Sequence, residues 1–219
     1  MAERQLSQLA ISAAKWPPAA ALITLLSLVA LFPEKYGLLP GWAKWPIWFV
    51  ILVLIILSTF AHASPTLRRL EGPLTFWLLV LMTSLVSFDV VHLVDLVVSG
   101  DRVIHGLPLL STAFVLWISN LVIFSLWYWL LDRGGPDLRL RGVRVPPDLQ
   151  FPALADPPSP NWTPGFIDYV FFAFNTSMAF SPTDTAPVSA RAKGLMMLQA
   201  LLSLVTLAIA AARAVNNLD

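Results

Sequence analysis

The stretch WTPGFIDYVFFAFNTSMAFSPTDTAPVSARAKGLMMLQALLSLVTLAIAAAR, residues 162–213, decides the fold of this chain. It opens on Thr163 and Pro164, which predict a helix start, because threonine can cap free N–H groups and proline at the first helical position gives up no bond. The apolar run 166–178 covers only about 20 Å as a helix, whereas a full bilayer span needs about 20 apolar residues. We therefore expect a half-helix that enters the bilayer without crossing it.

A polar turn at residues 181–184 ends this half-helix, and the chain restarts as a helix behind the potential cap Ser189. The restarted helix stays apolar over 194–212, which is long enough for a span. Irregular backbone at membrane depth is tolerated only where protein buries it or where it lines a water-filled cavity. The turn is therefore the expected functional element, between a re-entrant half-helix and the last transmembrane helix.

Residues 169–215 resemble the pore loop and inner helix of the two-transmembrane potassium-channel pore domain, whose filter reads Thr-Val-Gly-Tyr-Gly-Asp. Asp184 and Pro187 match the aspartate of that filter and the proline three residues beyond it. The resemblance implies a polar filter entrance and then a filter, with candidate residues Asn175, Thr176, Ser177, Phe180, Ser181, Pro182, Thr183 and Asp184.

The filter positions depart from the potassium-channel pattern. Ser181 and Thr183 stand where that family has its two glycines, and Pro182 stands where it has tyrosine. A potassium filter aims successive carbonyls at the ion along a backbone path that depends on the conformational freedom of glycine. We therefore expect a filter that is not selective for potassium.

The whole chain also resembles a group of bacterial multi-span membrane proteins with no assigned activity. The resemblance rests on the run Trp127-Tyr128-Trp129, on residues 132–136 with the sequence DRGGP, and on residues 180–185 with the sequence FSPTDT. It implies a membrane fold and no particular reaction.

The composition is that of an all-α integral membrane protein. Hydrophobic residues make up 57% of the 219 residues and charged residues only 12%, whereas charged residues are near 25% in soluble domains, and the mean hydropathy is +0.73. The net charge of +1 gives no reason to expect a nucleic-acid partner, and the absence of cysteine excludes disulfides and thiol chemistry. No sequence motif for an enzyme, a cofactor or a metal is present.

About five transmembrane helices are expected, together with a re-entrant half-helix of pore-loop type before the last of them. Residues 64–71 predict a short basic loop, and the proline- and arginine-rich residues 133–161 predict an extended linker without regular structure. The chain then divides into an N-terminal four-helix membrane region at 1–132, the linker at 133–161 and the pore-loop-like region at 162–219. Apolar runs place the first four spans at about 17–32, 46–63, 73–98 and 107–131.

Three ionisable residues, Asp89, His92 and Asp95, follow one another at intervals of three within the third span. Ionisable groups inside a span are costly and usually face the bundle interior. Their functional interpretation is a proton relay, a cation-attracting vestibule or a metal site. The plainer interpretation is a polar stripe at the membrane edge, and no cysteine or second nearby histidine strengthens a metal site.

Small and polar residues recur three or four apart on the last helix, at Gln199, Ala200, Ser203, Thr206 and Ala210. This spacing would give one narrow and wettable face, so Gln199, Ser203 and Thr206 are candidates for lining a pore. The same spacing serves tight helix packing equally well. In the fourth span, Asn120 lies with Ser119 near the middle, where an amide is expected to hydrogen-bond across helices, and a substrate contact is the alternative.

The distribution of basic residues conflicts with a potassium-channel topology. With a cytoplasmic N-terminus, ten of the lysines and arginines lie inside and four outside, which the positive-inside rule favours. The loop would then enter from the cytoplasmic side, whereas a potassium-channel pore loop enters from outside.

Two functions from different classes remain. The first is a weakly selective cation-conducting homo-oligomer in the plasma (inner) membrane of a bacterium, a tetramer if it forms a pore, with a ring of Asp184 carboxylates attracting an inorganic cation. The second is a non-conducting membrane scaffold or accessory subunit that keeps the pore-loop architecture. The partners expected in both cases are the lipid bilayer and further copies of the chain.

Overall fold

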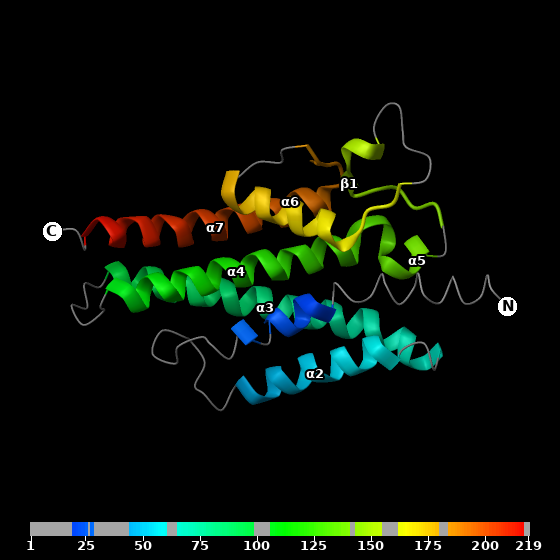
Figure 1. The fold of residues 1–219 in the computed structure, drawn as a ribbon, viewed down its shortest axis with the longest axis horizontal. Coiled ribbons are helices and arrows are strands. Elements are labelled where there is room, and N and C mark those ends of the chain that lie inside the picture. The colour runs from blue at the N-terminus through cyan, green and yellow to red at the C-terminus, as the bar shows by residue number, and fades with distance from the viewer. Residues whose placement is uncertain are drawn as a thin grey trace.

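The computed structural model describes residues 19–25, 27–28, 44–60, 65–98, 106–140, 143–154, 162–179 and 184–216. These residues are mostly helical, and Figure 1 shows the longest helices lying side by side along one direction. Within the described ranges, three stretches are long and apolar enough to cross a bilayer by length and composition: Gly72–Val98, Leu109–Gly134 and Ala190–Ala212. They indicate an integral membrane protein made of helices.

The first predicted span, 17–32, is described only in part, and its described residues, 19–25 and 27–28, are helical. The second corresponds to helix α2, Lys44–Phe60, which has 17 residues. The expected total of five spans stays a prediction, because among the described residues three helices meet the length and composition of a span.

Helix α3, Pro65–Val98, begins earlier than expected and contains Pro73 in its interior. The prediction of a loop is therefore wrong over residues 65–71. Both Pro65 and Pro73 match the preference of proline for the first helical turn, where its missing N–H costs no bond. The helix starts at Pro65, and the sequence pattern alone did not show which of the two prolines marks the helix start.

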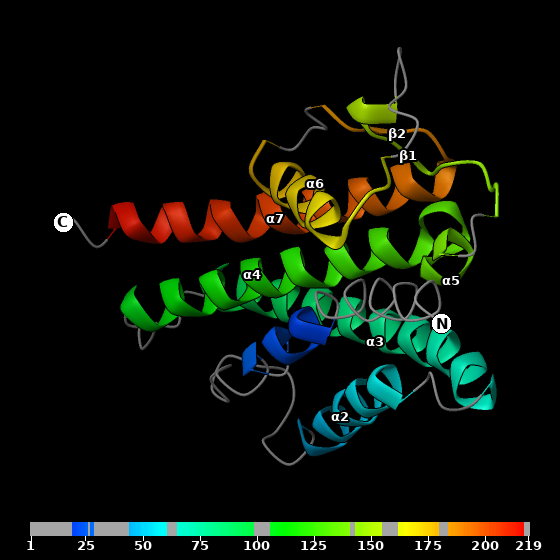
Figure 2. The same cartoon turned by 45° about the vertical axis from the view of Figure 1, so that its right-hand side comes forward.

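Helix α4, Gly106–Leu131, matches the fourth predicted span and is the centre of the fold. It packs against α3, against the short helix α6, Phe166–Ala179, and against the last helix α7, Ala190–Asn216. Large side chains between these helices are fully buried, among them Leu79, Leu116, Phe124, Tyr128, Tyr169 and Phe172. Both views show α6 and α7 on the same side of α4 (Figure 1, Figure 2).

The linker is more ordered than its proline content predicted. It contains the 3₁₀ turn η2, Asp132–Gly134, the helix α5, Pro136–Leu140, the strand β1, Leu149–Gln150, and the 3₁₀ turn η3, Pro152–Leu154. Strand β1 pairs antiparallel with β2, Ala186–Pro187, which directly precedes α7. The expectation of an extended linker without regular structure is thus wrong in these segments.

The starts of α6 and α7 use different caps. Helix α6 begins at Phe166 and not behind Thr163. Here Gly165 N–H donates to Asp168 Oδ2 at 2.8 Å, and the carboxylate takes the role that the glutamate plays in a capping box. The Ser189 cap of α7 is confirmed, since its Oγ accepts from Ala192 N–H at 3.1 Å.

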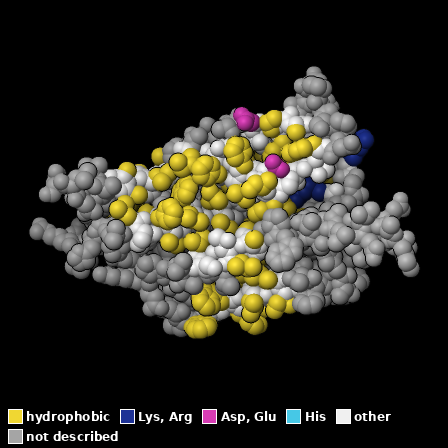
Figure 3. All heavy atoms as spheres, in the orientation of Figure 1, with side chains coloured by type: hydrophobic (Ala, Val, Ile, Leu, Met, Phe, Trp, Pro, Cys, Tyr) yellow, Lys and Arg dark blue, Asp and Glu magenta, His cyan; other side chains and the backbone are white. Residues whose placement is uncertain are grey.

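The outside of the bundle is apolar, as lipid contact requires. Large hydrophobic side chains exposed on the helices include Phe49, Trp77, Val91, Phe114, Phe171, Met197 and Leu201. On the face drawn in Figure 3, hydrophobic side chains cover the middle, and the few acidic and basic ones lie at the upper edge and to the right of centre. A soluble protein rarely exposes so continuous an apolar surface.

Candidate functional site

Two groups of polar side chains lie among α4, α6 and α7. The first, here called the interhelix network, lies within the bundle and consists of Asn120, Tyr128, Ser177, Gln199 and Ser203. The second, here called the anchor cluster, lies at the end of α4 and consists of Asp132, Arg139, Asp148, Tyr169 and Arg191.

Gln199 is the centre of the interhelix network and is 0% exposed. Its Nε2 donates to Ala173 O at 2.8 Å and to Ser177 Oγ at 2.9 Å, both on α6. Its Oε1 accepts from the hydroxyl of Tyr128 on α4 at 2.7 Å. One amide on α7 therefore uses both of its N–H donors and its oxygen to join three helices.

Asn120 adds a second bridge between α4 and α7. Its Nδ2 donates to Ser203 Oγ at 2.6 Å and to the backbone carbonyl of Gln199 at 3.3 Å. The expectation that Asn120 bonds across helices is confirmed. Its Oδ1 is buried, and no group in the described ranges donates to it.

The pore-lining candidates of α7 all lie inside this single chain. Gln199, Ser203 and Thr206 are buried, and the Thr206 hydroxyl donates to Leu202 O of its own helix at 2.7 Å. The filter-entrance candidates Thr176 and Ser177 are buried as well. The structure thus brings together the polar residues of α6 and α7 and turns them toward α4.

The filter candidates are only partly described. Phe180, Ser181, Pro182 and Thr183 lie outside the described residues. Asn175 is half-buried on α6, and Asp184 is exposed in the bend before β2. Their role stays a prediction.

The ionisable residues Asp89, His92 and Asp95 lie on α3, which packs against α4 and α7, and Figure 2 shows α3 on the side of α4 opposite to α6. Asp89 and His92 are half-buried and Asp95 is exposed. Within the described part of the chain, no three histidine, cysteine, aspartate or glutamate residues are grouped so that they could hold a metal ion.

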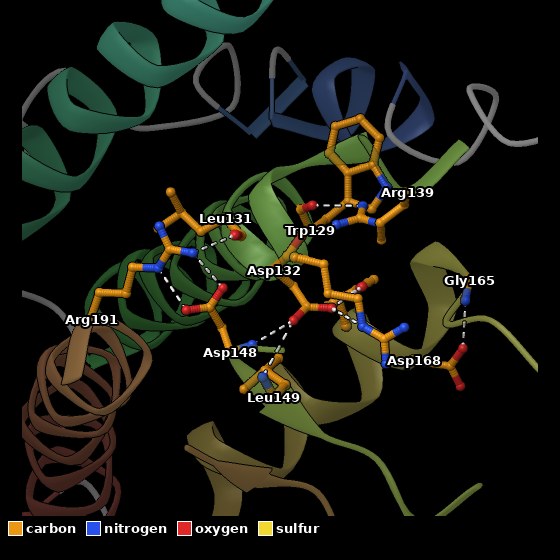
Figure 4. Close-up of polar contacts among 11 residues, drawn as sticks. Trp129, Leu131, Asp132, Arg139, Asp148, Leu149, Gly165, Asp168 and Arg191 are labelled. Carbon is orange, nitrogen blue, oxygen red and sulfur yellow. Dashed lines mark hydrogen bonds and ion pairs between the residues drawn. The ribbon is translucent and has the colours of Figure 1, made fainter. Parts of the chain in front are cut away.

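Asp132 is the centre of the anchor cluster and is 1% exposed. Its Oδ1 accepts from the backbone N–H groups of Asp148 at 2.9 Å and Leu149 at 3.3 Å, and its Oδ2 accepts from the Tyr169 hydroxyl at 2.8 Å. Figure 4 shows this carboxylate between the end of α4 and the linker. It therefore fastens β1 and α6 to the end of α4.

Arg139 reinforces the same end from α5. Its guanidinium donates to Asp132 O at 2.5 Å and to Trp129 O at 2.7 Å, two carbonyls at the C-terminal end of α4. It also lies over the rings of Trp129 and Tyr169. Burial lowers the pKa of Arg139, and the charges of Tyr169 and Asp132 act in the opposite direction.

Asp148 connects the linker to the first turn of α7. Arg191 donates to both of its carboxylate oxygens at 2.6 Å, and this arginine also donates to Leu131 O at 3.2 Å. Burial acts to raise the pKa of Asp148, but the hydrogen bonds from Arg191 and Ser189 outweigh it, so the pKa lies below the ordinary value of 3.8. The pair is a bidentate salt bridge, which fixes the orientation of the two side chains.

Acid is expected to release this contact. Because the pKa of Asp148 is lowered by folding, the stabilisation is complete above its ordinary pKa of 3.8 and is lost as the pH falls through the lower, folded value. Hydrogen exchange of the β1 amides, corrected for the intrinsic effect of pH, should therefore rise below that ordinary value. In Asp148→Asn the exchange should be faster already near neutral pH and should depend less on pH. Equal profiles for both proteins would contradict a role for the carboxylate.

The sequence pattern missed most of the anchor cluster. Asp132 was grouped with the helix end, and Asp148 and Tyr169 were given no role. The run Asp132–Gly135 was the only sequence indication that a structured turn follows α4. Gly134 and Gly135 take positive φ angles of 72° and 99°, which end a helix sharply. The partners of Asp132 come from residues 16 to 37 positions further along the chain, and no local pattern identifies them.

No family model, no curated protein and no solved structure matches this chain. The resemblance to the potassium-channel pore domain and to the bacterial membrane group therefore stays a prediction from the residues quoted for it. The assignment that these findings support is an integral membrane protein of helices, with α4, α6 and α7 joined by two polar groups.

Proposed function

We propose that the protein is a non-conducting membrane scaffold or accessory subunit with a pore-loop architecture. In this proposal it is a multi-pass protein of the plasma (inner) membrane of a bacterium, with five spans and with α6 as a re-entrant half-helix. At about 1.5 Å per residue, the 14 residues of α6 reach about 21 Å, less than the roughly 30 Å of the hydrocarbon core.

The observation that carries this proposal is the direction of the polar side chains on α7. Gln199 and Ser203 use their hydrogen-bonding groups within one subunit. Beyond the first turn of α7, which carries the exposed Arg191 and Lys193, the residues that α7 turns outward are apolar, and Met197 and Leu201 are among the most exposed. A helix that lines a water-filled pore needs the opposite arrangement, with wettable groups on its free face.

The order of the elements favours a second candidate, the weakly selective cation channel. Helices α6 and α7 both begin near the end of the bundle where α4 ends (Figure 1, Figure 2). A pore helix and an inner helix would begin at one end in the same way. In this alternative, four copies would surround an axis, with Asn175 and Asp184 near the constriction.

Ion flux distinguishes the two candidates. The purified protein is reconstituted into liposomes that hold potassium and sodium gradients, and gramicidin in matched liposomes shows that the assay responds. We expect the flux to equal that of protein-free liposomes, and Asp184→Asn to leave it unchanged. A flux above that background that falls in Asp184→Asn would overturn the scaffold and support the channel.

Gln199→Ala provides a second comparison. In a scaffold this change lowers stability and leaves ion permeability at background. In a channel it changes flux or selectivity in protein that still inserts and purifies. Native mass spectrometry of the same samples gives the number of copies, and a monomer without flux excludes a central pore.

A further inference from the structure

The end of the bundle where α4 ends carries an excess of positive charge. Of the nine lysines and arginines in the described ranges, seven lie at this end: Arg68, Arg69, Arg133, Arg139, Arg144, Arg191 and Lys193. Lys44, at the start of α2, and Arg213, near the end of α7, lie at the other. By the positive-inside rule this end faces the cytoplasm, where the leaflet carries anionic lipids.

The buried acids of the anchor cluster neutralise only two of its basic neighbours. Asp148 is paired with Arg191, and the Asp132 carboxylate lies 3.9 Å from Nε of Arg133, whereas Arg139 donates to the backbone carbonyl of Asp132. Three aspartates, Asp132, Asp137 and Asp148, and four arginines, including Arg133 and Arg144, leave a net charge of one positive unit. Arg144 is exposed, and Arg133 has a side chain that is 23% exposed.

Arg133 stands out for both its backbone and its side chain. Its φ angle is +52°, a left-handed conformation that glycine adopts freely and that side chains disfavour. Its Nε is buried and has no hydrogen-bond acceptor among the described residues, since Asp132 Oδ2 lies 3.9 Å away. A strained residue with an unused donor calls for a functional reason, and here the unused donor is the Nε–H of a guanidinium at ion-pair distance from Asp132.

Arg133 and Arg144 lie on adjoining segments. A Cβ added to Gly134 would lie 3.8 Å from Cγ1 of Val145, so the residue after Arg133 lies beside the side chain of the residue after Arg144. The bond from Asp148 N–H to Asp132 Oδ1 holds the two segments in this register. Trp129, an aromatic residue of the type found at membrane interfaces, lies on the last turn of α4 beside them.

We propose that Arg133 and Arg144 form a binding surface for the phosphate of an anionic lipid headgroup. A guanidinium matches phosphate oxygens with paired N–H donors. The surface lies at the end of a stretch long enough to cross the bilayer, which is where headgroups are found. This inference does not depend on whether the protein conducts ions.

The test uses the full-length protein in detergent, titrated with phosphatidylglycerol or with phosphatidylcholine and observed by native mass spectrometry. The variants are Arg133→Gly, Arg144→Gln and their combination, with Arg213→Gln as the matched control at the opposite end. One charge near a membrane surface contributes about 1 kcal/mol, so each variant should bind phosphatidylglycerol about fivefold more weakly. Arg213→Gln and the affinity for phosphatidylcholine should not change.

Arg133→Gly separates binding from folding, because glycine accepts the positive φ angle of this position. The variant is expected to melt no earlier than the wild type and still to lose affinity for phosphatidylglycerol. Equal retention of the two lipids by the wild type, or unchanged binding in the double variant, would overturn the proposal. Full competition by millimolar inorganic phosphate would also overturn it and would identify a site for free phosphate.

Discussion

Replacing Gln199 with alanine is expected to lower the free energy of unfolding by about 3 kcal/mol. The substitution removes three hydrogen bonds and leaves the Tyr128 hydroxyl, Ala173 O and Ser177 Oγ without the amide that joins them. It also leaves a cavity where α4, α6 and α7 meet. Unfolding in mixed micelles with increasing denaturing detergent, followed by circular dichroism, measures the change.

Met197 provides the matched control, since it lies on the same helix and is 74% exposed. Met197→Ala should change the free energy of unfolding by no more than about 0.5 kcal/mol, as is usual for exposed positions. Tyr128→Phe should have a smaller effect than Gln199→Ala, because it removes one of the three bonds. A loss for Gln199→Ala no larger than that for Met197→Ala would contradict the central role of this amide.

Asp132→Ala is expected to have an effect of similar or greater size, about 3–5 kcal/mol. The carboxylate accepts from two backbone N–H groups and the Tyr169 hydroxyl, and its loss leaves these donors buried without an acceptor. Removing its charge also takes away a partner of the buried Arg139. Beyond the global loss, β1 should detach from α4, and trypsin should cut after Arg139, which is protected in the wild type.

Two further substitutions provide an intermediate case and a control for Asp132→Ala. Asp132→Asn keeps one carbonyl oxygen for the backbone N–H groups and should cost less than Asp132→Ala. Asp184→Asn changes an exposed carboxylate and should leave both stability and the tryptic pattern as they are. Wild-type protection at Arg139 in Asp132→Ala would show that the linker is held by other contacts.

The helices of the C-terminal part could be predicted because their information is local. The apolar run of α4, the short run of α6 and the Ser189 cap of α7 are each contained in a few neighbouring residues, and the structure has them at nearly the expected positions. The start of α3 was missed because Pro65 and Pro73 carry the same signal. Thr163 was a plausible cap, but Gly165 and Asp168 made the cap instead.

The polar groups could be predicted only as separate residues. Gln199, Ser203 and Asn120 were recognised as polar positions within apolar helices, and helix packing was one of the two interpretations offered for them. Which way a helix turns its polar face depends on its neighbours, and the bond between Tyr128 and Gln199 joins residues 71 positions apart. Asp132 went unrecognised because two of the donors to its carboxylate are backbone N–H groups, which have no signature in a sequence, and the third, the Tyr169 hydroxyl, lies 37 positions away.

The bridges from α4 to α7 impose an order on the biosynthesis of this protein. Asn120 and Tyr128 enter the bilayer with α4, whereas Gln199 is translated 79 and 71 residues later. Until α7 arrives, these α4 groups lack the partners that satisfy them in lipid, where an unbonded polar group is costly. The last helix therefore completes the bundle, and a chain arrested before it would expose in the membrane the polar surface by which quality-control proteases recognise unassembled helices.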